Sequence, residues 1–362
     1  MIINRLIELT IQIQQIPAPT FEEGLRAKFI QEQFAAEGLE DIQCDSAGNV
    51  LARLPGTGLG APLIVSAHMD TVFPMETDLA LRRADNRLYG PGIGDNSLGV
   101  AGLFGLLWGL RERGQKLPGD MWLVANTCEE GLGDLRGMRS IVKRFEANPR
   151  VYLILEGMAL GHVYHKAICV RRYKISVQTS GGHSWIDYGK PSAIHEIAGL
   201  ISKISGLKIP VRPHTTFNVG RVGGGTSINT IAPEAWMELD LRSEEQACLN
   251  ELARQVETLV RQPIRAAVAV KTEIIGERPG GEISAEQPVI LLAQNCLRQQ
   301  GLEPVLTIGS TDANIPLSKG YPALVLGLTR GGGAHTGKEF IETEPIKQGL
   351  EQLIQFVSKV WD

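Results

Sequence analysis

The sequence lacks the cysteine pattern of a disulfide-stabilised or zinc-ribbon protein. It has only five cysteines, scattered along the chain, and no two of them stand at CxxC spacing. A disulfide framework is therefore not expected, and a reducing cytoplasm is the compartment that fits best.

The chain also lacks a dominant sign of charge and a long apolar run. Its 36 basic and 40 acidic residues give a formal net charge of −4. Without a basic half, we expect no nucleic-acid partner. No uninterrupted apolar run reaches the roughly 18 residues of a membrane span. The first apolar stretch is broken by Arg5, Glu8 and Gln12 and does not read as a signal peptide. We therefore expect a cytoplasmic protein with no membrane partner.

What remains is an ordinary globular composition, 43% hydrophobic and 21% charged, in 362 residues. At about 150 residues per domain, this length predicts two domains, or one domain with a large insertion.

Helical and strand-like segments alternate in the first and last parts of the chain. Residues 151–155 are apolar throughout, which is typical of a strand covered on both faces. Thr20 and Glu23 have the spacing of a capping box and predict the start of a helix that ends at Gly38. We predict an α/β fold with a mostly parallel sheet covered by helices on both faces. The predicted strands are 49–54, 63–67, 121–126, 151–155, 305–309 and 323–328, and the main helices are 1–16, 97–113, 134–146, 286–300 and 346–360.

The pattern changes between residues 168 and 280. Residues 168–179 alternate with period two, and the order of elements that follows is β-α-β-β-α-β, as in a ferredoxin-like α+β module. One α/β domain interrupted by a second domain explains this better than two domains in series. We predict the first part of the α/β domain at 1–167, the inserted domain at 168–280 and the second part at 281–362.

Polar side chains follow four of the predicted strands, where ligand sites of open α/β sheets form. Asp95 stands apart from them, in a glycine-rich segment just before a predicted helix. The side chains that follow the strands are His68 and Asp70, then Glu129 and Glu130, then Glu156, and last His335.

Each of these signals is weak by itself. A His-x-Asp pair is more often a surface turn, and a pair of glutamates is more often a solvated corner. However, adjacent carboxylates at a partly buried edge are costly unless a cation compensates them. Gly90, Gly92 and Gly94 do not make a dinucleotide loop, because Asn96 stands where the third glycine belongs.

Taken together, the two histidines and three carboxylates make a mixed nitrogen and oxygen donor set that suits Zn²⁺. One carboxylate can bridge two ions, and Glu129 is then left to act as a base. The carboxylates of this donor set are Asp95, Glu130 and Glu156.

These motifs in this order resemble the dizinc exopeptidase and deacylase family, which includes carboxypeptidase G, aminoacylase-1, acetylornithine deacetylase, succinyl-diaminopimelate desuccinylase and peptidase T. The resemblance runs from Pro17 to His335. It is carried by the segments HMDTV, GPGIGDNSLG, TCEEG, LEG, SGGHS, GGTSINTIAP, STDAN and GGGAHTG.

The resemblance implies two Zn²⁺ ions, for which Co²⁺ or Mn²⁺ can substitute. It assigns His68 and Glu156 to one ion, Glu130 and His335 to the other, and the bridging position to Asp95. Asp70 would orient His68 as a catalytic partner, and Glu129 would act as general base. The peptide bond after Asp95 is often cis in the family.

In the inserted domain, which resembles the family's lid, the resemblance implies three further residues. His183 would stabilise the oxyanion, in its own subunit or across a homodimer formed through the lid. Asn229 would lie near the substrate, and Arg278 would bind a substrate carboxylate. Arg242 is a further candidate for that carboxylate, with an ion pair inside the domain as its alternative. The other histidines, His162, His165, His195 and His214, are assigned no metal.

The function implied is a zinc-dependent metallopeptidase that cleaves an amide bond of small peptides, as a carboxypeptidase or a tripeptidase does. The alternative is an N-acyl-amino-acid deacylase. A binding protein that keeps the fold without the chemistry is a third reading, which the intact set of predicted ligands disfavours.

Overall fold

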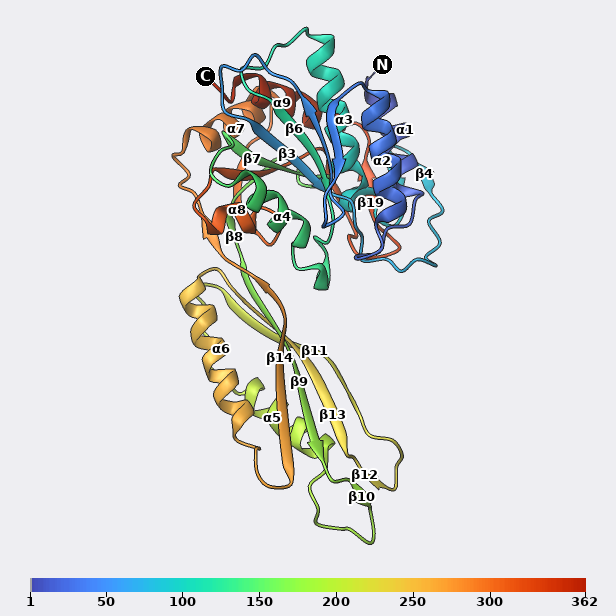
Figure 1. The fold of residues 1–362 in the computed structure, drawn as a ribbon, viewed down its shortest axis with the longest axis vertical. Coiled ribbons are helices and arrows are strands. Elements are labelled where there is room, and N and C mark those ends of the chain that lie inside the picture. Colours follow the sequence, from blue (N-terminus) through green and yellow to red (C-terminus); the bar gives the residue numbers. More distant parts are fainter. Residues whose placement is uncertain (1) are drawn as a thin grey trace. The chain divides into compact units, whose positions relative to one another are not determined.

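The computed structural model describes residues 2–362, which fold into two compact units (Figure 1). The larger unit is the chain before Ile168 together with Gly281–Asp362, and the smaller unit is Ile168–Gly280. These limits coincide with the domain limits that the sequence predicts.

A nine-stranded sheet forms the centre of the larger unit. Its four middle strands, β6, β3, β7 and β17, run parallel to one another, and the strands outside them pair mostly antiparallel. The predicted mostly parallel α/β fold is thus confirmed. In spatial order the strands are β1 (Glu40–Cys44), β2 (Val50–Leu54), β6 (Met121–Asn126), β3 (Leu63–His68), β7 (Val151–Glu156), β17 (Ala323–Gly327), β8 (His162–Ala167) and β15 (Gly281–Glu282), with β16 (Val305–Gly309) parallel to β8.

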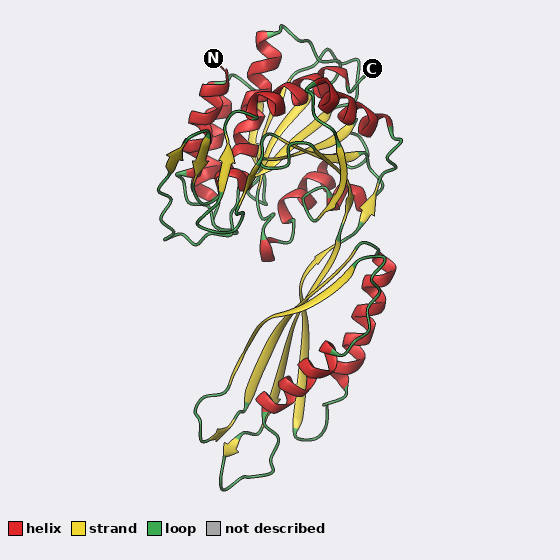
Figure 2. Ribbon diagram, turned by 180° about the vertical axis from the view of Figure 1, so that it is seen from behind, coloured by secondary structure: helices red, strands yellow, loops and turns green. Residues whose placement is uncertain are grey.

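Helices cover both faces of this sheet (Figures 1 and 2). Every residue of β3 and of β17 is buried, which requires cover on both sides of the strand. The covering helices are α1 (Ile2–Gln14), α2 (Gly24–Ala36), α3 (Leu98–Glu112), α4 (Arg136–Phe145), α7 (Pro288–Gln299), α8 (Asn314–Ser318) and α9 (Ile346–Lys359).

Helix α3 is the most apolar of these helices. With the turn before it, it forms a segment, Ile93–Glu112, that is long and apolar enough to cross a membrane. In the structure 94% of this segment's most apolar window is buried, so it serves as a core helix of the larger unit. Counting uninterrupted apolar runs does not single it out, because Asp95 and Asn96 lie within it.

Two predictions for the larger unit need correction. The expected capping box is absent: α2 begins at Gly24 and has no side-chain cap. The chain instead turns before the helix, with Phe21 at a φ of +81° and the Thr20 hydroxyl donating to Asp70. In addition, the sequence predicts no strand at residues 162–167, but this segment, which contains His162 and His165, forms β8 within the sheet.

A small four-stranded sheet joins segments that are distant in the sequence. Its order is β18 (Gly331–Gly332), β19 (Phe340–Glu342), β5 (Arg87–Tyr89) and β4 (Arg82–Ala84). The β5–β19 pairing brings the glycine-rich segment that carries Asp95 next to the loop that carries His335.

The inserted unit has its own hydrophobic core and the predicted β-α-β-β-α-β order. Its sheet is antiparallel, in the order β11-β13-β9-β14, which is the ferredoxin-like arrangement. Its elements are β9 (Cys169–Thr179), α5 (Ala193–Ser205), β11 (Thr215–Gly224), β13 (Glu234–Ser243), α6 (Gln246–Arg261) and β14 (Val268–Arg278), with the short pair β10 (Gly182–His183) and β12 (Thr230–Ile231) beyond the end of β9.

The close approach of α9 to the end of β17 depends on Gly349. A Cβ atom at this position would lie 1.9 Å from the carbonyl oxygen of Leu328, which is backbone and cannot rotate away. We therefore expect Gly349→Ala to lower the free energy of unfolding by about 1–3 kcal/mol, measured by urea denaturation. Gly24→Ala is the control, because a Cβ there meets nothing within 4 Å. An equal effect of the two substitutions would contradict the packing argument.

Candidate metal centre

The centre is built at the carboxyl ends of the parallel strands. His68 is the last residue of β3 and pairs in register with Asn126, the last residue of β6. Glu156 ends β7 and pairs with Gly327, the last residue of β17. Since all four strands end at one edge, the loops that follow them carry their polar side chains to one place.

Asp95 lies between the two histidines. One of its carboxylate oxygens, Oδ1, is 3.1 Å from His68 Nε2, and the other, Oδ2, is 3.1 Å from His335 Nε2. Glu156 Oε2 is 3.8 Å from His68 Nε2, and Glu130 Oε1 is 3.0 Å from His335 Nε2. The five side chains therefore form two groups that share Asp95.

These spacings fit two zinc ions. Ligand atoms at about 2.0–2.2 Å from a tetrahedral zinc lie about 3.3–3.6 Å from one another, close to the separations observed here. The two groups, each with donor atoms within 4.8 Å of one another, are His68, Asp95 and Glu156, and Asp95, Glu130 and His335. The same spacing also joins Glu129 to His68 and Glu130, so distance alone does not separate the predicted base from the ligands.

The charges point to bound cations as well. Burial raises the pKa of Glu156 well above its usual range, and the nearby carboxylates of Asp95 and Glu129 add to this rise. Burial acts to lower the pKa of His68, but Asp70 and Asp95 outweigh it, and the pKa is raised. The bonds to Asp95 and then Glu130 raise the pKa of His335 to about 10. A divalent cation held among these groups would compensate the same buried negative charge.

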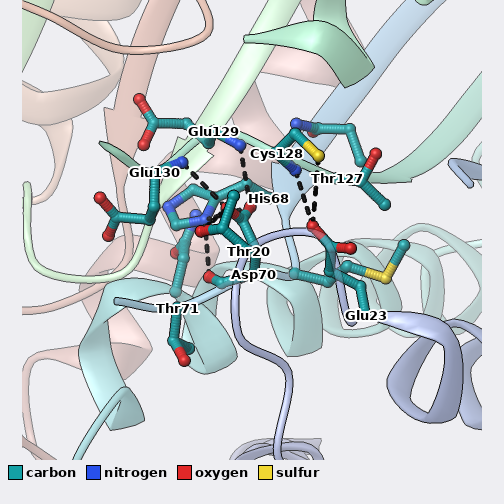
Figure 3. Close-up of polar contacts among 12 residues, drawn as sticks. Thr20, Glu23, His68, Asp70, Thr71, Thr127, Cys128, Glu129 and Glu130 are labelled. Carbon is teal, nitrogen blue, oxygen red and sulfur yellow. Dashed lines mark hydrogen bonds and ion pairs between the residues drawn. The ribbon is translucent and has the colours of Figure 1, made fainter. Parts of the chain in front are cut away.

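Asp70 lies beneath this cluster and organises the loops around it (Figure 3). Its carboxylate accepts the N–H groups of Glu129 and Glu130 and the hydroxyl of Thr20, each at 2.9 Å. Towards His68, the nearer partner of Nδ1 is the Asp70 carbonyl oxygen at 3.1 Å, with carboxylate Oδ1 at 3.5 Å. Both oxygens favour a proton on Nδ1, which leaves Nε2 available as a ligand.

Asn96 fixes the segment that carries Asp95 to the end of β7. Its side-chain amide donates to the Leu155 carbonyl and accepts the N–H of Gly157, at 2.8 and 2.9 Å. Gly99 makes room for it, since a Cβ there would lie 1.9 Å from Asn96 Oδ1. The Asp95–Asn96 peptide bond is cis, as it often is in the family that the motifs resemble.

Glu339 is a functional residue that the sequence reasoning missed. It is fully buried and accepts the N–H groups of Gly92, Gly94 and Asp95 at 2.8–3.1 Å. Burial raises its pKa to about 7, although these bonds act in the opposite direction. Glu339 therefore holds the backbone of Asp95, the residue predicted to bridge the two ions. Its only signal in the sequence is its place four residues after His335.

Asp312 is a second residue without a predicted role. It lies in the STDAN segment, is fully buried, and accepts a bond of 2.6 Å from the side-chain amide of Asn126. Its charge contributes to the raised pKa of Glu156, which places it within the electrostatic reach of the centre.

In the inserted unit, the structure brings His183 and Asn229 together. The β10–β12 pair joins their loops, and the N–H of Ser184 donates to the Asn229 carbonyl at 3.0 Å. The N–H of Trp185 donates to His183 Nδ1 at 3.2 Å. A neutral His183 that accepts at Nδ1 carries its proton on Nε2, where it can be donated to an oxyanion.

Arg278 lies at the other end of the same unit. It is buried at the end of β14, opposite Val170 near the start of β9, whereas His183 follows the end of β9 at Thr179. Nine residue steps along this strand correspond to about 30 Å. Arg242 makes the ion pair inside the unit, to Asp240 at 2.7 Å.

Among residues 2–362, none of the donor groups that could hold a metal includes His162, His165, His195 or His214. His165 Nδ1 lies 2.8 Å from the carbonyl oxygen of Ile283, which gives this ring a structural partner.

The arrangement predicts the metal content of two histidine variants. Wild-type protein loaded with Zn²⁺ and desalted should retain about two ions per chain, measured by inductively coupled plasma mass spectrometry. His335→Ala should reduce this to about one ion, because one group loses its only nitrogen donor. His195→Ala, which removes a histidine outside the donor groups, should retain the wild-type content. Equal metal content in all three proteins would refute the assignment.

Substitution of Glu339 should weaken zinc binding, although Glu339 is not one of the predicted ligands. Glu339→Gln replaces one acceptor oxygen by a donor amide beside backbone N–H groups, so the Asp95 segment should lose part of its support. We expect zinc affinity to fall about 10- to 100-fold in competition with a chelator. Glu342→Gln is the matched control, because Glu342 pairs with the exposed Arg87. An unchanged affinity in Glu339→Gln would show that these bonds do not support the centre.

Comparison with known proteins identifies the family. The model of peptidase family M20/M25/M40 matches residues 64–359. An acetylornithine deacetylase from Pectobacterium atrosepticum is 26% identical over 336 residues, which cover 85% of this chain and 82% of the relative. A tripeptidase structure from Staphylococcus aureus has a TM-score of 0.83 at 22% identity, over 99% of this chain and 98% of the other.

A dinuclear metal-binding peptidase of the M20 family from Bacillus subtilis has a TM-score of 0.71 at 17% identity, over 99% of this chain and 98% of the other. At these identities the two structures demonstrate a shared fold. The family match extends over most of the chain, including every strand that ends at the centre. The chain therefore belongs to peptidase family M20/M25/M40 and is a hydrolase of that family.

Proposed function

We propose that this hydrolase uses two zinc ions to cleave an amide bond of small peptides. The observation that carries the proposal is the position of Asp95, with one carboxylate oxygen 3.1 Å from each of two histidines. Two ions that share a carboxylate make a centre suited to attack on an amide carbonyl by water.

When bound, the zinc ions polarise the substrate carbonyl and lower the pKa of water. His68, Glu156, Glu130 and His335 would hold the ions, and Asp95 would be shared between them. Glu129 takes a proton from the attacking water and delivers it to the leaving nitrogen. Two observations support this role: its backbone N–H is fixed on Asp70 at 2.9 Å, and it lies beside His68 and Glu130.

His183 stabilises the oxyanion that forms at the substrate carbonyl, through a proton on Nε2. Arg278 binds the substrate carboxylate with its guanidinium group. Arg278 lies beside the start of β9 and His183 follows its end, about 30 Å away along the strand. One small substrate therefore cannot touch both residues in a single inserted unit. We therefore propose that the His183 that serves a site comes from a second copy of the chain, in a homodimer formed through the inserted units.

The second candidate function is deacylation of N-acyl amino acids. The similarity to acetylornithine deacetylase over 85% of the chain favours it. Both reactions cleave an amide next to a carboxylate-bearing residue, so the proposed machinery serves either substrate.

A substrate panel tests the proposal and separates the two candidates. The panel contains free and N-blocked di- and tripeptides and N-acetyl, N-succinyl and N-formyl amino acids, and products are identified by mass spectrometry after loading with Zn²⁺. We expect release of single amino acids from peptides. Cleavage of acyl groups alone would establish the deacylase instead, and two bound ions without any product would overturn hydrolysis of small amides.

Glu129→Gln separates the base from the ligands. If Glu129 moves the proton, this variant should keep about two zinc ions per chain while kcat falls about 100- to 10,000-fold. Metal content and kcat are measured on the same preparation. Glu22→Gln, at an exposed position before α2, should behave as wild type. Loss of a zinc ion from Glu129→Gln would reassign Glu129 as a ligand.

A further inference from the structure

An apolar groove lies beside the metal centre in the larger unit. Three loops form it: the turn before α2, the loop after β3, and the loop after β6. The exposed apolar side chains in it are Phe21, Val72 and Leu132, with 52%, 40% and 47% of their surface accessible. The residues that line it are Pro19, Thr20, Phe21, Thr71, Val72, Pro74, Glu130, Gly131 and Leu132.

The groove is continuous with the centre through Glu130. This residue lines the groove and also lies 3.0 Å from His335 Nε2 in the donor cluster. Leu132 follows it by two residues, and Thr71 and Val72 directly follow Asp70. A substrate whose amide lies at the metal centre therefore has a side chain within reach of the groove.

Hydrogen bonds between the loops hold the first two walls of the groove in place. The Arg26 side chain is buried and donates to the carbonyls of Ile16 and Met69, which ties the first loop to the second. The backbone N–H of Thr71 donates to the Ala18 carbonyl at 2.9 Å, beside a bridge between Pro19 and Thr71. The groove is thus a fixed surface of the fold.

Phe21 lies in the groove although its backbone conformation is unfavourable for a residue with a side chain. The N–H of Glu22 donates to the Pro19 carbonyl at 2.8 Å, which closes a tight turn with Phe21 at its third position. Its φ of +81° is one that glycine adopts readily and phenylalanine rarely does. The Arg136 guanidinium lies 4.9 Å from the centre of its ring. The turn therefore tolerates an unfavourable residue and presents its ring at the surface.

From this geometry we infer that the groove binds an apolar side chain of the substrate, of leucine or phenylalanine size, and so determines specificity. Among the residues that line it, Glu130 is the only charged one, and it belongs to the metal centre. Apart from Glu130, the polar side chains that line the groove are the hydroxyls of Thr20 and Thr71, so a polar or charged substrate side chain would lose more hydration than it regains. The inference rests on the proposed amide hydrolysis and names the substrates within it.

The test compares paired substrates of similar shape, such as leucyl and asparaginyl peptides, by the ratio of their kcat/KM values. Wild-type enzyme should favour the leucyl member at least about 10-fold. Phe21→Gly removes the ring and supplies the residue that the turn favours, so it should fold. Phe21→Gly and Leu132→Ser should each reduce the ratio about 5-fold or more. Leu59→Ser, at a position 87% exposed and outside the groove, should not change it.

A binding measurement gives a second readout that does not depend on turnover. Leucine hydroxamate and asparagine hydroxamate share one metal-binding head, so the ratio of their dissociation constants in titration calorimetry reports the side chain alone. Wild type should prefer the leucine compound about 10-fold, and Leu132→Ser should lose most of that preference.

The outcomes separate the two proposals. If wild type cleaves no amide in the panel, the proposed hydrolysis fails, and the hydroxamate ratio still decides whether the groove accepts apolar side chains. If wild type cleaves peptides but shows no apolar preference, the groove inference alone is overturned. The same holds if neither Phe21→Gly nor Leu132→Ser alters the preference, or if Leu59→Ser alters it equally.

Discussion

The structure around the centre depends on one electrostatic constraint, the compensation of buried negative charge. Asp70, Asp95, Glu130 and Glu156 meet at the end of a sheet whose middle strands are covered on both faces. Carboxylates in such a place stay ionised only when cations or N–H donors surround them. Asp70 and Glu339 are satisfied by backbone N–H groups. Asp95 instead has a histidine nitrogen on each side, and these nitrogen and oxygen donors together suit a metal ion.

The acidic residues of the surrounding loops fall into two groups according to what they contact. Acidic residues that contact backbone N–H groups fix the loops, and acidic residues that face the histidines are the predicted metal ligands. Asp70 belongs to the first group although it is only two residues from His68. Asn96 and Gly99 perform a similar task without charge, by joining the Asp95 segment to the end of β7. The positions of the predicted ligand atoms are thus set by groups that need not touch an ion.

The sequence predicts the α/β fold and the inserted unit because both rest on periodic patterns that extend over many residues. It also predicts which side chains gather at the centre, since all of them except Asp95 lie in the segments that follow apolar strands. It fails for Glu339 and Asp312, whose partners are backbone N–H groups or an amide far away in the chain. It fails for Thr20 and Glu23 for the opposite reason: the local pattern of a cap is present, but the hydrogen bond of Thr20 to Asp70 replaces it. The strand β8 was missed because its neighbours, β16 and β17, lie more than a hundred residues further on.

The place where the inserted unit leaves and rejoins the larger unit has a consequence for how such a chain could have arisen. Ala167 and Gly281 are direct antiparallel partners on β8 and β15. Antiparallel partners have their Cα atoms only about 4.5–5.5 Å apart, a gap that a two-residue hairpin turn can close. The larger unit is therefore a complete sheet in which 113 residues occupy the place of a tight turn, and the inserted unit keeps a core of its own. A gene could gain or exchange this segment without altering any strand that carries the centre.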